Sequence, residues 1–418
     1  MTQVSKSYCR VPFDSVTITN TGRMQLCCEA QWTELLQTEK TKLTEIKSID
    51  EWFQSDYLNN VRKLMLQGKK LKECESCYKN EKLYNTSPRI GINNKYFKNN
   101  NDLQEKSIKK IDLKLGNKCN LKCKMCFPYA SSELWKEWKD LGWNSTEKDP
   151  NSKTSWRYYD GYFEEDYAWP KNKSNMDKIK EAAIKSKLIH VTGGEPTINP
   201  EFFDLLKYCI QNNVAKDIKL EVTTNATKIH PKFFDMVKEF KNIVLTISMD
   251  GTGKTYEYVR YPANYNVVHK NILRYNEFIK TLNNNSCLRF NFVFQLWNVH
   301  NAIDVIKTLS PLAVNHDESP VMFDMLNDPQ FMHWSMLPES YIKQVIKDLS
   351  VEMKTDHPQI IRWGLIKLVG ILKAYKQMDN TKIDDLKKQL VEFTTVQDKH
   401  RNIKLENYIP QLVSPLSI

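Results

Sequence analysis

The sequence lacks any apolar run long enough to cross a bilayer, and its first residues, MTQVSKSYCRVPFD, lack the apolar core of a signal peptide. It also lacks internal repeats and low-complexity tracts, and its basic residues never gather into an arm. These absences favour a globular cytoplasmic protein with no membrane partner.

The chain has 418 residues, enough for two or three domains, and its 41% hydrophobic and 27% charged residues are ordinary for a soluble protein. A formal net charge of +11 favours acidic partners, such as a flavodoxin-like electron donor, an acidic peptide or RNA. A lysine-rich surface that only meets solvent explains the charge equally well, so binding to nucleic acid stays open.

A fourth cysteine is missing beside the triplet in GNKCNLKCKMCF, where Cys119, Cys123 and Cys126 fall within eight positions. Metals held by thiolates usually take four ligands, so this loop leaves one position for an outside group. In a reducing compartment, clustered cysteines favour metal binding over disulfides. The spacing admits a [4Fe–4S] cluster with one open iron or a zinc ion. Cys209 and Cys287 stand alone and are expected in the core.

Six short β-runs alternate with helical segments from about residue 110 onward, at 110–116, 187–194, 217–225, 242–251, 288–295 and 321–326. Such alternation predicts right-handed βαβ units and a parallel sheet. The fold expected is α/β, a partial (βα)6 TIM-like barrel, with a doubly wound sheet as the alternative.

The flanking segments differ from this barrel. Residues 1–85 contain a predicted hairpin, FDSVTIT and RMQLCC, then a helical stretch from Ser48 to Gly68, and form a small cysteine-rich α+β module. We expect four parts in the chain: this module (1–85), a connector (86–109), the barrel (110–337) with an aromatic-rich insertion (128–175), and a helical carboxyl-terminal region (338–418). The insertion is either a wall for a substrate or a packed lid.

A second motif follows the triplet by one βα unit. HVTGGEPTINP places Gly193, Gly194, Glu195 and Pro196 at the end of the second predicted barrel strand. Paired glycines let the backbone approach a ligand closely, and a glutamate can accept hydrogen bonds from an ammonium group. By itself the motif could be only a turn.

Together these motifs resemble the radical S-adenosylmethionine (radical SAM) superfamily over about residues 110–326. The resemblance implies that S-adenosylmethionine completes the [4Fe–4S] cluster of the triplet and that the segment 193–196 holds its methionyl ammonium. It further implies reductive cleavage to methionine and a 5′-deoxyadenosyl radical, with a flavodoxin- or ferredoxin-like protein as electron donor.

The same resemblance extends along the barrel. Ser248 and Asp250 end the fourth predicted strand, where relatives contact the ribose hydroxyls, and Asn225 ends the third, where relatives carry Thr-Asn-Gly. Arg260 matches an arginine near the S-adenosylmethionine carboxylate in peptide-modifying relatives. Met125 departs from the pattern, because relatives commonly have an aromatic residue there that packs on the adenine.

The amino-terminal cysteines resemble half of a SPASM or Twitch module. Cys9, Cys27, Cys74 and Cys77 are expected to close a second [4Fe–4S] cluster, with Gly22 in the hairpin turn and zinc as the alternative occupant. Cys28 competes with Cys27 as the ligand. Such modules usually follow the barrel, whereas here the cysteines precede it.

Relatives with auxiliary modules mostly modify peptides or proteins, so a peptide or protein substrate is expected. One alternative is a nucleotide-derived substrate, as in pyranopterin synthase, and another is a non-catalytic zinc or iron–sulfur protein that binds RNA or protein. No acid or base is assigned, although Asp324 and Asp328 near the sixth strand are candidates.

Overall fold

The computed structural model describes residues 5–31, 40–85, 87–97, 102–143, 165–315, 320–375, 378 and 380–416. The chain divides into two compact units, one made of Met1–Lys118, Asp166–Val222 and Lys232–Asn242, the other of Cys119–Glu165, Thr223–Pro231 and Ile243–Ile418. The eight strands in the described part are mainly parallel, with helices between them. This confirms the α/β class expected from the sequence.

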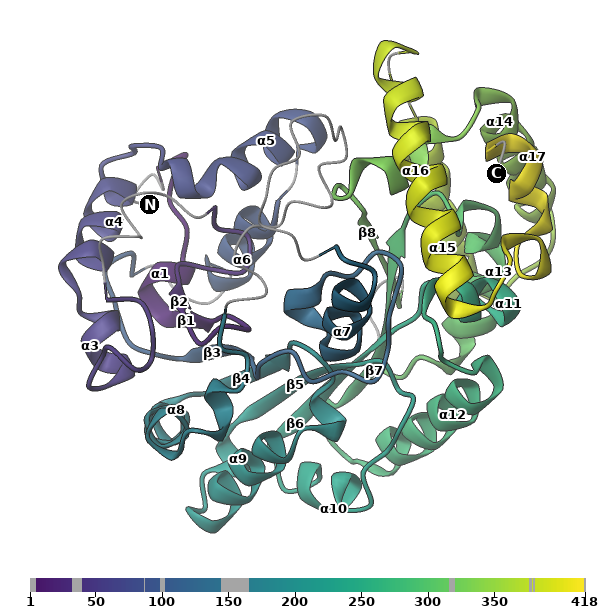
Figure 1. Ribbon diagram of the computed structural model, residues 1–418. Helices are drawn as coiled ribbons and strands as arrows, with labels where there is room; N and C mark the ends of the chain where they lie inside the picture. Colours follow the sequence, from purple (N-terminus) through teal and green to yellow (C-terminus); the bar gives the residue numbers. More distant parts are fainter. Residues whose placement is uncertain are drawn as a thin grey trace. The chain divides into compact units, whose positions relative to one another are not determined.

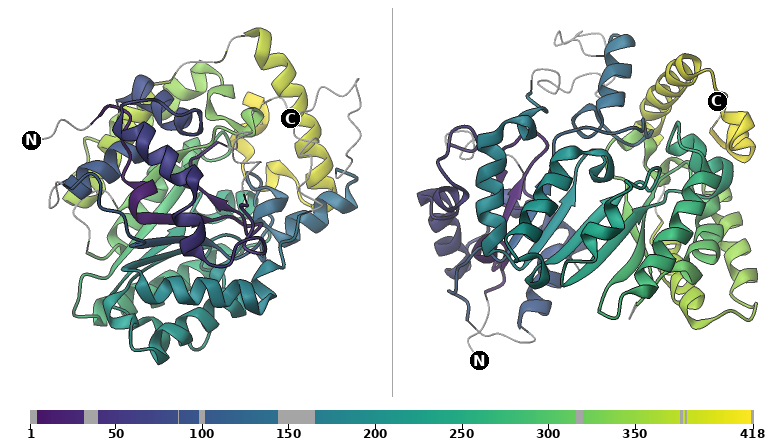
Figure 2. Two further views of the ribbon diagram at one scale, coloured as in Figure 1. Left: turned by 90° about the vertical axis from the view of Figure 1, so that its left-hand side faces the viewer. Right: turned by 90° about the horizontal axis from the view of Figure 1, so that it is seen from below.

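The first unit contains strands in the order β2-β1-β3-β4-β5. Strands β1 and β2 form an antiparallel hairpin, whereas β1, β3, β4 and β5 run parallel to their neighbours (Figure 2). The bounds are Ser15–Ile18 (β1), Met24–Gln25 (β2), Lys110–Lys114 (β3), Leu188–Thr192 (β4) and Lys219–Thr224 (β5). The predicted hairpin is confirmed, and its first strand continues the sheet to which β3 belongs.

The two faces of these strands differ in polarity. One face carries the buried residues Ile111, Leu113, Ile189, Val191, Leu220 and Val222. Helices α8 (Lys173–Lys185) and α9 (Pro200–Gln211) lie along one side of the strands (Figure 1). On the other face Asp112, His190 and Glu221 stand in register across β3, β4 and β5. These three polar side chains therefore share the face opposite the apolar one.

Short helices complete the first unit: α1 (Val11–Asp14), α3 (Ile49–Phe53), α4 (Asp56–Leu66), α5 (Glu75–Tyr84), α6 (Pro88–Phe97) and α10 (Phe233–Val237). The sequence predicted one helical stretch from Ser48 to Gly68, and the structure has two helices there. Ser48 caps α3 by accepting from the Glu51 amide. Ser55 caps α4 by accepting from the Leu58 amide, and this second cap explains the break.

The second unit contains β6 (Asn242–Ser248), β7 (Cys287–Phe294) and β8 (Val321–Met325), which are parallel and neighbours in that order. Its helices include α7 (Ser132–Asp140), α11 (Gly253–Val259), α12 (Tyr265–Thr281) and α13 (Ala302–Leu309). From β1 onward, parallel strands within each unit keep the order of the chain. A doubly wound sheet reverses its strand order, so the arrangement favours the barrel.

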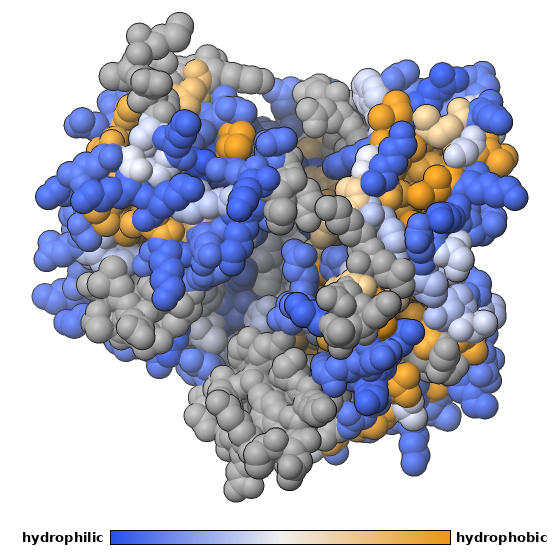
Figure 3. Space-filling model, turned by 90° about the horizontal axis from the view of Figure 1, so that it is seen from above, coloured by the Kyte–Doolittle hydropathy of each residue, from blue (hydrophilic) through white to orange (hydrophobic). Residues whose placement is uncertain are grey.

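The carboxyl-terminal region is helical, as predicted: α14 (Glu339–Glu352), α15 (Gln359–Lys373), α16 (Asn380–Arg401) and α17 (Val413–Leu416). Val351 and Ile366 are its most exposed large apolar side chains, at 63% and 55% exposure. The face seen from above is mostly hydrophilic with small apolar patches (Figure 3). No helix in the described ranges is long and apolar enough to cross a membrane.

Candidate functional site

The cysteine triplet lies in the segment that leads from β3 to α7, and the start of α7 holds that segment in place. Ser131 caps α7 and donates from Oγ to the Leu121 carbonyl at 2.6 Å. Ser132 Oγ accepts from the Cys119 amide and donates to the Cys119 carbonyl, each at 3.2 Å. The loop conformation is therefore fixed by hydroxyl groups from the first part of the predicted insertion.

The thiols of this loop sit in an environment that opposes ionisation. Burial and the neighbouring Cys123 thiol raise the pKa of Cys126 to about 12. Burial also raises the pKa of Cys123, although the positive charge of Arg260 acts against it. A bound metal is what converts such thiols into thiolates at neutral pH.

The fit of the loop to an iron–sulfur cluster rests on its donor chemistry. In the described part of the chain, no three His, Cys, Asp or Glu side chains are arranged as a ready metal site. Three thiols within eight positions, one of which (Cys123) contributes to raising the pKa of another (Cys126), are nevertheless the ligand type that iron–sulfur clusters use. These residues fit the cluster by chemistry, and the side-chain geometry is not preformed.

Arg260 and Asp250 form a buried ion pair beside the cysteine loop. Arg260 Nε donates to Asp250 Oδ2 at 2.6 Å, and Arg260 Nη1 lies 4.0 Å from Cys123 Sγ. Asp250 is fully buried, and its Oδ1 accepts from the Val293 amide at 2.7 Å. Burial alone would lower the pKa of Arg260, but the Asp250 carboxylate and Cys123 raise it. Arg260 is therefore a fixed cation, oriented by Asp250.

In the first unit, the Gly193–Gly194 turn lies against the end of β3. Both glycines have positive φ, +80° and +55°. A Cβ on Gly193 would approach Lys114 Cα to 2.8 Å, and a Cβ on Gly194 would collide with the Lys118 backbone. The next amide, that of Glu195, donates to the Lys118 carbonyl at 2.7 Å. The turn is thus anchored to the residue that precedes Cys119 in the chain.

The Glu195 carboxylate takes part in the turn itself. Glu195 is 1% exposed, and its Oε1 accepts from the Thr197 amide at 3.0 Å and from Thr197 Oγ1 at 2.7 Å. Pro196 begins a short 3-10 turn, Pro196–Ile198, which Glu195 caps. The Glu195 side chain therefore stabilises the conformation of the segment.

Asn20 from the amino-terminal hairpin braces the same region, and sequence reasoning missed it. Its Nδ2 donates to the Gly116 carbonyl at 2.8 Å, and its own carbonyl accepts from Trp169 Nε1 at 2.8 Å. A Cβ on Gly22 would lie 2.9 Å from the Trp169 ring, so this turn position requires glycine. The NTG tripeptide was the available signal, but the sequence indicated only a turn there.

Two polar pairs lie at strand ends of the second unit. Asn225 Nδ2 donates to Asn120 Oδ1 at 3.1 Å, which ties the end of β5 to the residue after Cys119. Ser248, half-buried, is in register with Asn291 on β7. Asn291 Oδ1 is buried and has no hydrogen-bond partner among the described residues. A buried acceptor without a partner is costly unless a ligand or water supplies one, and the sequence gave no reason to select Asn291.

The remaining predicted residues are less constrained. Met125 is half-buried in the cysteine loop. Asp324 is exposed on β8, and its charge contributes to raising the pKa of Asp250 after the larger effect of burial. Asp328 is also exposed. Of the predicted site residues, Cys123, Arg260 and Asp250 therefore lie close together, whereas Asp324 and Asp328 are exposed.

The four amino-terminal cysteines all belong to the first unit, but among the described residues no three of them are arranged to hold a metal ion. After the effect of burial, the nearby thiols Cys74 and Cys77 contribute to a pKa of about 12 for Cys9. Burial likewise raises the pKa of Cys27, with smaller contributions from Cys28, Cys9 and Cys74. For Cys28, burial and then the Asp112 carboxylate raise the pKa to about 11. The pKa of Cys27 is thus influenced by other cysteines, whereas that of Cys28 is influenced by a carboxylate of β3.

The described part of the aromatic insertion is packed. Trp138 and Trp143 are 2% and 5% exposed, and Trp143 stacks on Phe393 of α16 at 5.3 Å between ring centroids. These two rings belong to the core. Residues 144–164, which carry much of the expected insertion, lie outside the described residues.

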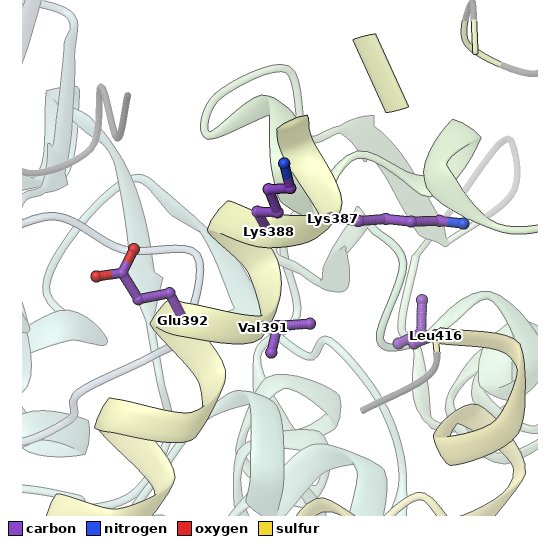
Figure 4. Close-up of a pocket in the computed structure, with 5 residues that line it drawn as sticks. All are labelled: Lys387, Lys388, Val391, Glu392 and Leu416. Atoms are coloured by element: carbon purple, nitrogen blue, oxygen red, sulfur yellow. The ribbon is translucent and has the colours of Figure 1, made fainter. Parts of the chain in front are cut away.

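A pocket of about 370 Å³ opens beside α16 in the second unit (Figure 4). Its lining consists of Lys387, Lys388, Val391, Glu392 and Leu416. None of the predicted site residues lines it, so it is separate from the chemistry considered above.

Comparison with known proteins gives one family match, "Radical SAM superfamily", over residues 113–290. Such a domain implies a [4Fe–4S] cluster and S-adenosylmethionine as cofactors. No curated protein is recognisably similar to the chain in sequence.

Several solved structures share a weak likeness. SuiB of Streptococcus suis bound to S-adenosylmethionine is 15% identical, with a TM-score of 0.34 over 58% of this chain and 44% of that one. SuiB bound to its precursor peptide SuiA is 15% identical, with a TM-score of 0.34 over 58% of this chain and 46% of that one. Native anSMEcpe with bound AdoMet is 18% identical, with a TM-score of 0.35 over 57% of this chain and 59% of that one. The chain thus spans about half the length of these structures.

Proposed function

We propose that this chain is a radical SAM enzyme, because the family model matches residues 113–290, and that it reductively cleaves S-adenosylmethionine. Cys119, Cys123 and Cys126 would hold the [4Fe–4S] cluster. When bound, the cluster supplies the electron that splits S-adenosylmethionine into methionine and a 5′-deoxyadenosyl radical. The observation that carries the proposal is a fixed, buried Arg260 within 4.0 Å of a triplet thiol, inside the matched segment.

Arg260 has the properties needed to bind the carboxylate of S-adenosylmethionine. It is a permanent cation in a largely buried position, where a charge-assisted hydrogen bond is stronger than at the surface. Asp250 uses one carboxylate oxygen for Arg260 and the other for the Val293 amide. We therefore assign Asp250 as a positioning residue for Arg260, in addition to its expected place near the ribose.

The other expected contacts remain part of the proposal. The segment Gly193–Pro196 would hold the methionyl ammonium, with Glu195 Oε1 already accepting two hydrogen bonds from Thr197. Ser248 would meet the ribose hydroxyls, and Asn291 joins it because its buried acceptor lacks a partner among the residues described. Asn225 would fix the cysteine loop through Asn120. Met125 would pack on the adenine.

We propose a second [4Fe–4S] cluster held by Cys9, Cys27, Cys74 and Cys77. The contributions of Cys74 and Cys77 to the raised pKa of Cys9, and of Cys9 and Cys74 to that of Cys27, support this grouping, and the contribution of Asp112 to the pKa of Cys28 supports Cys27 as the ligand. Four cysteines fit a closed cluster, and they fit zinc equally well by chemistry. Iron and zinc analysis of the triple variant Cys119→Ala, Cys123→Ala, Cys126→Ala separates the two.

A peptide or protein is the substrate class we propose, with a flavodoxin- or ferredoxin-like electron donor. The support is the resemblance of the cysteine pattern to peptide-modifying relatives, together with the net charge of +11, which suits an acidic partner. A nucleotide-derived substrate is the alternative within the same chemistry. The alternative to an enzyme is a non-catalytic metal protein. The following experiment distinguishes the enzyme from the non-catalytic protein.

The test is formation of 5′-deoxyadenosine by the reconstituted protein with dithionite and S-adenosylmethionine under anaerobic conditions. We expect slow cleavage without substrate by the wild type and none by the triple alanine variant. If the iron-loaded wild type forms no 5′-deoxyadenosine, or if the triple variant forms as much, the proposed function is wrong.

A further inference from the structure

A lysine lies between the second and third cysteines of the triplet, and its charged end is fully buried. Lys124 has no exposed side-chain area, and its Nζ contacts Asp398 Oδ1 on α16 at 2.5 Å. The same ammonium group lies 4.2 Å from the ring centroid of Tyr258 and donates to Gln397 Oε1 at 3.2 Å. Tyr258 in turn donates from its hydroxyl to Asp398 Oδ2 at 2.8 Å. Both oxygens of Asp398 are therefore engaged.

A second set of contacts joins the same helix to the cysteine loop one turn further on. Arg401 Nη2 donates to the carbonyl of Lys122, the residue before Cys123, at 2.7 Å. Arg401 also pairs with Glu137 of α7 through two nitrogens, at 2.9 and 2.6 Å, and neither side chain is exposed. The residues on both sides of Cys123 are thus bound to the end of α16, residues 397–401.

Stability does not account well for these buried charges. Removing two charges from water costs several kcal/mol per ion, and an apolar pair of similar volume is often as stable or more so. What an ion pair adds is direction, because it fixes where each side chain points. Contacts that fix the residues on each side of a metal ligand such as Cys123 also fix the position of that ligand.

We propose that the end of α16, residues 397–401, positions the cysteine loop for the cluster and its cosubstrate, and that Lys124 is the positioning residue. The proposal rests on the proposed function and assigns to the carboxyl-terminal region a part in it. Partners of metal ligands typically change affinity or activity about 10- to 100-fold when they are removed. Loss of the tie is expected to weaken S-adenosylmethionine binding by a factor in that range.

The experiment compares anaerobically reconstituted wild type with Lys124→Met, with the double variant Lys124→Met, Asp398→Leu, and with Lys387→Met. Lys387 lies on α16 in the open pocket (Figure 4) and serves as the control, since it is the same lysine-to-methionine substitution, made in the helix that Lys124 contacts. The measurements are iron content, the affinity for S-adenosylmethionine, the change it induces in the electron paramagnetic resonance spectrum of the reduced cluster, and the melting temperature.

Lys124→Met is expected to melt lower and to bind S-adenosylmethionine at least about tenfold more weakly. The double variant is expected to regain the melting temperature without regaining the affinity or the spectral change, which separates positioning from stability. Lys387→Met should match the wild type in every measurement.

Wild-type affinity and spectrum in Lys124→Met would overturn the positioning proposal while the function stands. Full recovery of affinity in the double variant would do the same, because packing alone would then suffice. A wild type that takes up no iron overturns both proposals.

Discussion

Gly194 shows how one backbone position can govern the end of β3. Its φ of +55° is in the left-handed region, and a Cβ there would meet the Lys118 carbonyl carbon at 2.8 Å. Gly142 has a φ of +69° but open space around the corresponding Cβ. An alanine at Gly142 would therefore meet backbone strain alone, whereas an alanine at Gly194 would meet both backbone strain and a steric clash.

We predict that Gly194→Ala lowers the free energy of unfolding by more than about 3 kcal/mol, because strain and overpacking add. Gly142→Ala should cost only about 1 kcal/mol, from strain alone. Urea unfolding of the metal-free variants measures both. Equal losses in the two variants would mean that the turn at Gly194 does not press on Lys118.

Asp250 provides a second prediction for a single residue. Asp250→Asn keeps the shape of the side chain but removes the charge that orients Arg260, so S-adenosylmethionine should bind about tenfold more weakly with iron content unchanged. Equilibrium binding and iron analysis on the same preparations measure the two effects. Arg260→Lys, which retains a charge without the planar guanidinium, should behave similarly. Unchanged affinity in both variants would remove Arg260 from the binding site.

Residues whose role depends on a sequence motif could be selected from the sequence, and those whose role depends on packing could not. The cysteine triplet and the Gly-Gly pair stand at fixed spacings along the chain. Asn291 matters only because strand register places it beside Ser248, and Lys124 only because α16 returns 274 positions later to meet it. No local pattern encodes such long-range partners.

At the scale of elements, alternation of β-runs and helical stretches predicted all six strands from β3 to β8 within a few residues. The hairpin of β1 and β2 was also predicted. The parallel pairing of β1 with β3 was not predicted, because Val16 and its register partner Ile111 lie 95 positions apart and the chain between them shows no βαβ alternation.

The pairing of α7 with α16 leads to a prediction about acid stability. Burial alone would raise the pKa of Glu137, but Arg401, Lys122 and Gln397 outweigh it and lower that pKa. A lowered carboxyl pKa stabilises the fold above the unfolded-state value, about 4.3, and this contribution is lost as pH falls through the folded-state pKa.

Glu137→Gln should therefore lower the free energy of unfolding by about 3 kcal/mol at pH 7, since it leaves Arg401 buried without its charge partner. The difference from wild type should begin to shrink as pH falls below about 4.3, where the unfolded-state carboxyl takes up a proton, and should be lost once pH falls below the lowered folded-state pKa of Glu137. Urea unfolding of the metal-free proteins at several pH values tests this. A difference that stays constant with pH would show that the Glu137 charge is not involved.

At the scale of the whole molecule, the amino-terminal segment is part of the sheet of its unit and not an appendage. Strand β1 covers the edge of β3, and Asn20 holds the Gly116 carbonyl. Removal of residues 1–109 would leave the edge of β3 that pairs with β1 without a partner strand, and such an edge can pair with other chains.

We predict that a chain starting at Lys110 is insoluble or aggregates, as judged by soluble yield and size-exclusion chromatography beside the full chain. A soluble, folded and iron-binding core without residues 1–109 would show instead that this segment is a separable module.

The measurement that tests the central claim most directly is the iron, sulfide and zinc content of the full chain after anaerobic reconstitution, beside the Cys119→Ala, Cys123→Ala, Cys126→Ala variant. Two [4Fe–4S] clusters predict about eight irons per chain in the wild type and about four in the variant. Four irons falling to none, with zinc retained, would keep the radical chemistry and replace the second cluster by zinc. Zinc in both proteins and iron in neither would contradict the account.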